Sequence, residues 1–351
     1  MTNGMAGITS WTNGEWFMSK RKHATRVWIS ISFCLLIYLS LPATAQCGGG
    51  PRSSQKSAQP VIIDTDIGDD IDDAFALALA LKSPELRVLG VSVTYGNTPM
   101  RARLTDRFLR EIGCSNIPVA LGEESPESTN PSQMNYALQE KESVHAAATD
   151  FLLKQIEANP GKVTLIAIGP LMNVGALIDK DPEAFRKLKR VVIMGGSIER
   201  HGSNLNGVPP DTPMAEHNIV EDIPDAQKLF SAGVPIYMMP LDSTHDLKLD
   251  EVKRRILFGS GSPITDQLTL LYTEWNAYAR FGQSTPTLFD AMAVAFAIKP
   301  ELCPTEAMHI RVDDKGLTHR EAGPTNAYVC LNSDPNLFFS FLISRLLSVE
   351  K

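Results

Sequence analysis

The segment from Val61 to Leu81, VIIDTDIGDDIDDAFALALAL, constrains the fold of this chain more than any other part of it. Its first three residues form an apolar β-branched run that is typical of a buried strand, and an alanine- and leucine-rich helical pattern ends it. Six aspartates lie between these two elements within ten residues: Asp64, Asp66, Asp69, Asp70, Asp72 and Asp73. The segment therefore predicts a strand, an acidic turn and a helix in immediate succession.

So many carboxylates in one turn repel one another unless a cation or a set of hydrogen-bond donors neutralises them. Aspartate is also a common turn and helix N-cap residue, which would account for Asp72 or Asp73 without a ligand. It would not account for Asp64 and Asp66, because an unpaired charge at the end of an apolar strand is costly. Oxygen ligands suit Ca²⁺ or Mg²⁺ better than zinc or copper. The turn is therefore a predicted metal or ligand site.

Apolar β-branched runs alternate with helical patterns along the chain. This alternation predicts an α/β fold with a single open, mostly parallel Rossmann-like sheet flanked by helices. The expected strands are 61–64, 88–94, 163–168, 190–194 and 235–239, with short β structure in 309–330. The expected helices are 73–82, 99–112, 144–158, 171–178, 223–232, 263–281, 287–298 and 335–348. Polar motifs follow the carboxyl ends of these strands, so one shared pocket is expected there.

Residues 1–45 have the order of a secretory signal peptide. Basic residues 20–22 precede an apolar stretch at 27–41, and an Ala-Thr-Ala cleavage motif ends at residue 45. The apolar stretch is shorter than the ~20 residues that a membrane span needs. We therefore expect a secreted or periplasmic protein. A retained membrane anchor and a lipoprotein modified at Cys47 are the alternatives.

After this leader, residues 46–59 are rich in Gly, Ser, Gln and Pro and predict a flexible lead-in, and residues 60–351 are expected to form one domain. Removal of residues 1–45 takes away four basic side chains and one acidic one, which changes the net charge from −7 to −10. An acidic protein binds nucleic acid and anionic membranes poorly, so a small-molecule partner is expected. Four cysteines remain without a C-x-x-C pair, and one disulfide is possible in an oxidising compartment.

The acidic segment resembles the N-terminal signature of the inosine-uridine nucleoside hydrolase family. Further segments resemble the family's in the same order: GNT from Gly96, IGPLMNVGAL from Ile168, MGG from Met194 leading to TPMAEHNI from Thr212, LDSTHDL from Leu241 and PTLFDAMAVA from Pro286. The resemblance runs from about residue 60 to the C-terminus and implies the nucleoside hydrolase fold. It also implies Ca²⁺-dependent hydrolysis of the N-glycosidic bond of ribonucleosides or related N-ribosides, and a homodimer or homotetramer.

The resemblance implies roles for individual residues as well. Asp66 corresponds to the catalytic aspartate that takes a proton from the Ca²⁺-bound water while it contacts the ion. Asp73, Asp290 and the backbone carbonyl of Met172 correspond to the other metal ligands. The remaining correspondences are to positions that bind the substrate: Asp72, Asn97, Glu216, Asn218 and His217.

Two departures from the family pattern concern the reacting groups. Two extra residues precede the Asp72-Asp73 pair, which makes Asp70 an alternative to one of these aspartates. Phe289 occupies the position of a histidine that protonates the leaving base in inosine-uridine-type members. The remaining candidates for that proton donor are His217 and His145.

A third departure is Pro210, which occupies the position of a ribose-binding asparagine; Asn204 and Asn206 are candidates to compensate from the same loop. These departures leave a non-catalytic ribose- or nucleoside-binding protein of the same fold open as an alternative function. A magnesium phosphohydrolase, which also places aspartates after a strand, is a further alternative, although suitably placed phosphate-binding Ser or Thr and Lys motifs are absent from the sequence.

Overall fold

The computed structural model of the chain describes residues 58–125, 130–202, 209–278 and 284–348. The predicted signal peptide and all but the last two residues of the predicted lead-in lie outside the described residues. The strands are β1 Gln59–Thr65, β2 Leu86–Val93, β3 Val119–Leu121, β4 Ala146–Ala147, β5 Thr164–Ala167, β6 Arg190–Met194, β7 Ile236–Met239, β8 Glu306–Val312, β9 Thr318–Glu321 and β10 Ala327–Val329.

These strands form one sheet with the order β4-β3-β2-β1-β5-β6-β7-β10-β8-β9. The pairings among β1 to β7 and the pairing of β7 with β10 are parallel, whereas those of β8 with β10 and with β9 are antiparallel. The predicted open, mostly parallel sheet is therefore confirmed. Strand β1 lies between β2 and β5, so the order of winding reverses on the two sides of it. The crevice at the carboxyl end of such a switch point is where open α/β sheets bind ligands.

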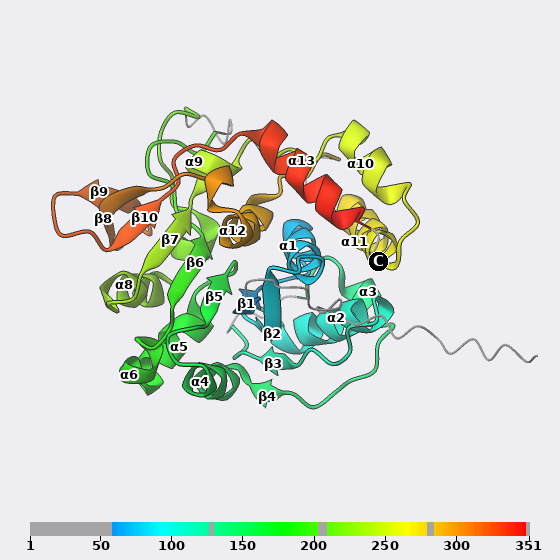
Figure 1. Cartoon of the computed structure of the whole chain (residues 1–351), viewed down its shortest axis with the longest axis horizontal. Coiled ribbons are helices and arrows are strands. Elements are labelled where there is room, and N and C mark those ends of the chain that lie inside the picture. The colour runs from blue at the N-terminus through cyan, green and yellow to red at the C-terminus, as the bar shows by residue number, and fades with distance from the viewer. Residues whose placement is uncertain (1–57, 126–129, 203–208, 279–283, 349–351) are drawn as a thin grey trace, which may run out of the picture. The chain divides into compact units, whose positions relative to one another are not determined.

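Helices cover both faces of the sheet (Figure 1). The helices on one side of the sheet are α1 Asp72–Leu81, α2 Thr98–Glu111, α9 Leu241–Thr244, α10 Glu251–Phe258, α11 Pro263–Tyr278, α12 Phe289–Ile298 and α13 Pro335–Leu346, which share one hydrophobic core. The other face packs against α4 Ala148–Ala158, α5 Met172–Lys180, α6 Pro182–Phe185 and α8 Ile223–Ser231. Short helices in the connections are α3 Met134–Ala137, α7 His217–Val220 and the 3-10 helix Pro300–Leu302.

Helices α1 and α12 lie side by side between the sheet and the outer helices α11 and α13 (Figure 1). Both are apolar on nearly every side, and most of their residues are buried. A helix that is apolar all round is stable only when it is enclosed in this way. The packing of α1 on α12 also brings together the N-termini of two helices that are more than 200 residues apart in the sequence.

The predicted elements are present, and most of their ends differ from the prediction by one or two residues. The helix predicted at 144–158 begins only at Ala148, because Ala146 and Ala147 pair with β3 as strand β4. Strands β3 and β4 and helices α3, α6, α7, α9 and α10 were not predicted. Most of them are too short for an apolar period to reveal them.

The disulfide that the sequence allowed joins Cys303, after the 3-10 helix, to Cys330, after β10. It connects the end of the α12 segment to the antiparallel edge of the sheet. None of the helices in the part of the chain that the structure describes has the length and apolar character needed to cross a bilayer.

Candidate functional site

A cavity of about 320 Å³ opens beyond the carboxyl ends of β1, β5 and β6. Its polar wall consists of the acidic turn after β1, Asp290 and the segment from Glu216 to Asn218. Its apolar wall includes Met194, Met214 and Phe289. A larger cavity of about 880 Å³ between α8 and the β8–β10 region has no acidic residue in its lining. The groups that can hold a cation therefore gather in the smaller cavity, which has the size of a small-molecule site.

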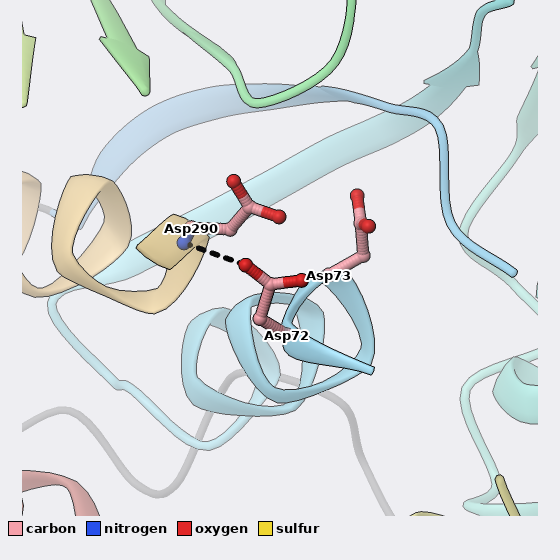
Figure 2. A group of neighbouring side chains, drawn as sticks. All are labelled: Asp72, Asp73 and Asp290. Atoms are coloured by element: carbon pink, nitrogen blue, oxygen red, sulfur yellow. Dashed lines mark hydrogen bonds between the residues drawn. The ribbon is translucent and has the colours of Figure 1, made fainter. Parts of the chain in front are cut away.

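Three of the carboxylates that line this cavity lie close together (Figure 2). Asp72 and Asp73 open α1, Asp290 lies in the first turn of α12, and one oxygen of each lies within 4.8 Å of the others. The Asp290 N–H donates to Asp72 Oδ2 at 3.2 Å, and the Thr65 hydroxyl donates to Asp73 Oδ1. All three aspartates are buried, with 3–4% of their surface exposed. The positive ends of the two helices favour negative charge here.

Burial, reinforced by the charges of neighbouring carboxylates, raises the pKa of Asp72, Asp73 and Asp290 well above the usual range. Buried carboxylates this close together cannot all ionise at neutral pH without a compensating positive charge. An oxygen-only cluster of this kind fits a hard divalent cation. The chemistry of this donor set therefore fits a bound metal ion.

Asp66 follows β1 directly and lines the same cavity. It does not belong to the group of three whose oxygens lie within 4.8 Å. Burial raises the pKa of its carboxyl, and the Arg101 guanidinium opposes that effect. The backbone after β5 approaches so closely that a Cβ on Gly169 would lie 2.8 Å from both the backbone N and Oδ1 of Asp66. Glycine is therefore required where β5 ends beside Asp66.

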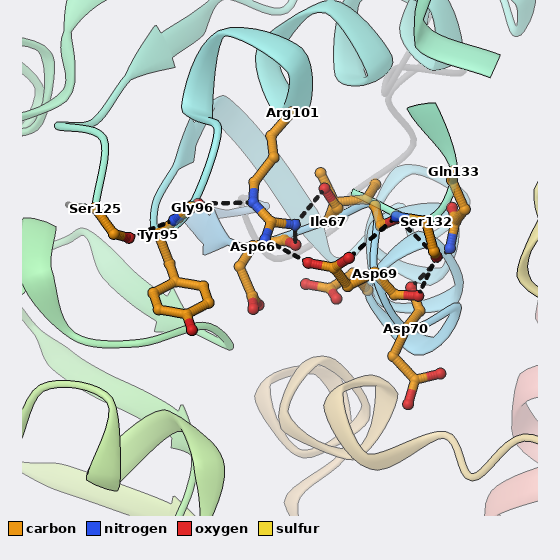
Figure 3. Close-up of polar contacts among 12 residues, drawn as sticks. Asp66, Ile67, Asp69, Asp70, Tyr95, Gly96, Arg101, Ser125, Ser132 and Gln133 are labelled. Atoms are coloured by element: carbon orange, nitrogen blue, oxygen red, sulfur yellow. Dashed lines mark hydrogen bonds and ion pairs between the residues drawn. The ribbon is translucent and has the colours of Figure 1, made fainter. Parts of the chain in front are cut away.

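Arg101, in α2, organises the acidic turn and was not identified from the sequence (Figure 3). It is 1% exposed. One guanidinium nitrogen, Nη1, donates to the carbonyls of Asp66 and Ile67, and Nη2 contacts Asp69 Oδ2 at 2.6 Å. The third, Nε, donates to the carbonyl of Tyr95 at 2.7 Å. Only the planar fork of arginine offers donors in these directions at once.

The two extra residues of the acidic turn lie at its outer side. The Asp69 carboxylate accepts from the Ser132 N–H at 3.1 Å as well as from Arg101, and Gln133 Nε2 donates to the Asp70 carbonyl at 2.9 Å. Asp70 lines the cavity, where partial withdrawal from solvent raises its pKa to about 6. The extra length is thus absorbed before α1, and Asp72 and Asp73 still open the helix.

Asp64 does not line the cavity; hydrogen bonds hold it behind the acidic turn. Its Oδ1 accepts from the Ser92 hydroxyl and from Asn173 Nδ2, the latter at 2.7 Å. Burial raises the pKa of Asp64 to about 7, although both donors favour the ionised form. Asn173, from the IGPLMNVGAL motif, also donates to the Val93 carbonyl and so connects β1, β2 and α5. These donors hold one oxygen of Asp64 outside the cavity, whereas Oδ2 is buried without a hydrogen-bond partner among the described residues.

Glu216 and Asn218 lie on the cavity wall, where backbone N–H groups bind the Glu216 carboxylate. Its carboxylate caps α7, accepting from the N–H groups of Gly196 at 2.9 Å and Asn218 at 3.0 Å. Asn218 Nδ2 donates to the carbonyls of Ile168 and Met194, each at 3.1 Å. These bonds fix the Asn218 amide at the ends of β5 and β6, and its Oδ1 accepts no hydrogen bond from the described residues.

Of the other predicted residues, His217 lines the cavity, whereas Asn97, Met172 and His145 do not. Asn97 caps α2 through Met100 N–H and donates to Asn130 Oδ1 at 2.8 Å. Met172 is the first residue of α5. His145 Nε2 lies 3.2 Å from Asp106 Oδ2. The predicted roles of Asn97 and of the Met172 carbonyl stay predictions. Asn204 and Asn206 lie outside the described residues.

Comparison with known proteins agrees with this geometry. Residues 61–340 match the family described as inosine-uridine preferring nucleoside hydrolase. The chain is 31% identical over 303 residues to a pyrimidine-specific ribonucleoside hydrolase of Citrobacter koseri, covering 80% of this chain and 92% of that protein. It is 32% identical over 305 residues to the corresponding protein of an Enterobacter species, covering 82% and 94%.

Solved structures give the same result. A plant nucleoside hydrolase superposes with a TM-score of 0.72 at 28% identity, covering 83% of this chain and 99% of that one. A purine-preferring ribonucleoside hydrolase from Gardnerella vaginalis superposes with a TM-score of 0.69 at 22% identity, covering 82% and 98%, which supports the fold alone.

Proposed function

Because this chain belongs to the inosine-uridine preferring nucleoside hydrolase family, a family of N-glycosyl hydrolases, we propose that it hydrolyses ribonucleosides or related N-ribosides to free base and ribose in a Ca²⁺-dependent reaction. The observation that carries this proposal is the buried cluster of Asp72, Asp73 and Asp290 beside Asp66 in a cavity of small-molecule size.

Asp72, Asp73 and Asp290, together with Asp66 and the Met172 carbonyl, are the groups that would hold the cation. Their oxygen-only character favours Ca²⁺ or Mg²⁺ over softer metals, and a larger set of ligands favours Ca²⁺. A bound Ca²⁺ supplies a Lewis acid that polarises water and ribose hydroxyls. Side chains of the cavity are proposed to accept the proton of the attacking water and to bind the ribose.

Asp66 is the proposed general base. It lines the cavity, and Arg101 and the Gly169 backbone fix its position. Loss of the base from ribose passes through a transition state that resembles an oxocarbenium ion, which water then attacks. A carboxylate in this position accepts the proton of the attacking water and stabilises positive charge that develops on the sugar.

Glu216 and Asn218 are the proposed ribose-binding residues. Backbone donors hold the Glu216 carboxylate rigidly, and the fixed Asn218 amide presents Oδ1 to hydroxyl groups in the cavity. Asp72 and, by the family resemblance, Asn97 are the other proposed contacts to ribose hydroxyls. A rigid set of acceptors favours a polyhydroxylated sugar because each hydroxyl that it contacts is a donor.

Release of free ribose from a panel of purine and pyrimidine nucleosides, with and without a chelator, tests the proposal. We expect ribose release that disappears on complete removal of Ca²⁺ and returns when Ca²⁺ is added. Activity that persists without metal would contradict the metal role. Tight nucleoside binding by calorimetry without any ribose release would favour the alternative, a binding protein of the same fold.

We further propose that the protein is exported after cleavage of residues 1–45 and that it assembles as a homodimer or homotetramer. The Cys303–Cys330 disulfide supports an oxidising compartment, because such bonds persist there and are rare in reducing ones. Mass spectrometry of the mature N-terminus tests the cleavage. Light scattering of the purified protein tests the assembly; a monomer at micromolar concentration would contradict it.

A further inference from the structure

Tyr95 is the one non-glycine residue with positive φ, 61°, in the described part of the chain. Left-handed backbone is unfavourable for a bulky residue, and such strain collects at functional sites, where the surrounding structure holds it. Arg101 holds it here: Nε donates to the Tyr95 carbonyl while the other guanidinium nitrogens hold the acidic turn (Figure 3). The direction of the Tyr95 side chain is therefore fixed relative to Asp66.

The Tyr95 side chain contacts His217, the first residue of α7, and Glu221, which directly follows that helix. Its ring lies edge-on to the imidazole of His217, with 5.5 Å between the ring centroids and an interplanar angle of 87°. Its hydroxyl donates to Glu221 Oε2 at 2.9 Å, and Glu221 Oε1 lies 3.5 Å from His217 Nδ1. Tyr95 and Glu221 thus hold the His217 ring from two sides.

His217 lies on the cavity wall with a side chain that is 54% exposed. Because Glu221 faces Nδ1, Nε2 is the ring atom left for a ligand. The cavity holds a second histidine, His201, but it is only 2% exposed, so exchange of its proton with solvent is hindered. Phe289, Met214 and Leu241 complete this wall and carry no proton to donate. Other charged groups of the cavity near His217 are the carboxylates of Asp66 and Glu216.

Resting on the function proposed above, we propose that His217 is the catalytic residue that protonates the departing base, with Tyr95 and Glu221 as positioning residues. As the bond between ribose C1′ and the base nitrogen breaks, its electron pair goes to the base, and His217 Nε2 gives its proton to the base. Water forms the new bond to C1′ and gives one proton to Asp66. His217 keeps its Nδ1 proton toward Glu221 and regains the Nε2 proton from solvent, to which Asp66 releases the proton that it took from the water.

The test compares two kinds of substrate on the Ca²⁺-loaded protein. Uridine and inosine need protonation of the leaving base, whereas 4-nitrophenyl β-D-ribofuranoside releases a stable anion without it. We expect His217→Gln to lower kcat for the nucleosides about 100-fold or more and to change the nitrophenyl reaction by only a few-fold. Tyr95→Phe, which loses the bond to Glu221, is expected to lower the nucleoside kcat about 10-fold at nearly constant KM. His319→Gln, which changes a carboxylate-paired histidine outside the cavity, serves as the matched control.

Equal loss on both substrates, or no loss on either, would overturn the role of His217. A rise in KM alone would do the same, because it would make His217 only a binding contact. Cleavage of the nitrophenyl riboside but of no nucleoside by the unaltered protein would also reject a working proton donor. Cleavage of neither substrate by the unaltered protein would instead reject the proposed function. Circular dichroism and the Tm of each variant separate these outcomes from misfolding.

Discussion

At the scale of single residues, the site depends on carboxylates that folding places where charge is unfavourable. Asp66, Asp72, Asp73 and Asp290 are buried, and each has a raised pKa because of that burial. Hydrogen bonds from the Asp290 N–H and the Thr65 hydroxyl orient Asp72 and Asp73, but they do not cancel so much negative charge. A cation is therefore the simplest partner for the cluster, and Arg101 provides a fixed positive charge behind it.

Asp66→Asn keeps the size of the side chain and removes its basicity. We expect kcat for the best nucleoside to fall by about 10³-fold, since loss of a general base typically costs 10²- to 10⁴-fold. Steady-state ribose release and the Tm of the Ca²⁺-loaded variant provide the measurement. A variant that folds normally and retains more than a tenth of the activity would show that Asp66 is not the base.

Arg101→Met retains much of the apolar volume but removes the donors for three backbone carbonyls and one carboxylate. Loss of one partner from a buried network typically costs about 3 kcal/mol or more. We expect that loss in the free energy of unfolding by denaturant titration, together with weaker Ca²⁺ binding by calorimetry. Arg103→Met, in the same helix but with a more exposed side chain, is the control, and an equal effect of both changes would argue against the special role of Arg101.

At the scale of elements, the site is assembled where β1, β5, α1 and α12 end or begin. The backbone that follows β5 must come close to the end of β1 so that the polar groups after the two strands can meet. Gly169 permits this approach, and Asn173 then bridges from α5 back to Asp64 and Val93. The packing of α12 on α1 brings Asp290 to Asp72 and Asp73 and so completes the cluster.

Gly169→Ala tests the close approach of β5 to Asp66. The added Cβ would meet the backbone and carboxylate of Asp66 at 2.8 Å, so that one of them must move. Because a misplacement of about 1 Å can cost about 10²-fold in rate, we expect kcat to fall by that order. Gly161→Ala is the control, because its added Cβ has no atom within 4 Å. The positive φ of Gly161, +72°, is unfavourable for alanine, so this change should lower stability without lowering kcat. Equal activity of both variants would contradict the prediction.

At the scale of the whole molecule, the stability of the folded protein should depend on pH, and bound metal should change that dependence. Asp64 has a folded-state pKa of about 7 against 3.8 for an ordinary aspartate, and Asp72, Asp73 and Asp290 are shifted in the same direction. Between these values the folded state binds protons that the unfolded state has released. Stability of the metal-free protein therefore falls as pH rises.

We expect the Tm of the chelator-treated protein to fall steadily between pH 5 and pH 8, whereas Ca²⁺ should flatten this dependence because it stabilises the ionised carboxylates. Thermal scans at several pH values, with and without Ca²⁺, give the comparison. Asp290→Asn removes one of the buried charges and should lessen the slope of the metal-free protein. A metal-free Tm that rises over this range would contradict the electrostatic account of the cluster.

The Cys303–Cys330 disulfide closes a loop across 27 residues. Chain-entropy arguments give about 3.5 kcal/mol for a loop of this length. We therefore expect the Cys303→Ala/Cys330→Ala double variant to lose about that amount of unfolding free energy, measured by denaturant titration. The cavity lies on other elements, so kcat at 25 °C should stay within a few-fold of the unaltered value. Loss of activity without loss of stability would contradict this separation.

Local sequence alone determined the strands, the main helices, the acidic turn and the likeness of ordered motifs to a known family, because residue period and composition are properties of neighbours in the chain. Tertiary structure decided which groups share a cavity. Asp290 meets Asp72 only because α12 packs on α1, Arg101 reaches the acidic turn from α2, and Tyr95 reaches His217 across the crevice beside β1. Such contacts join residues tens to hundreds of positions apart, and no short-range pattern encodes them, because they arise only when the sheet brings the strand ends together.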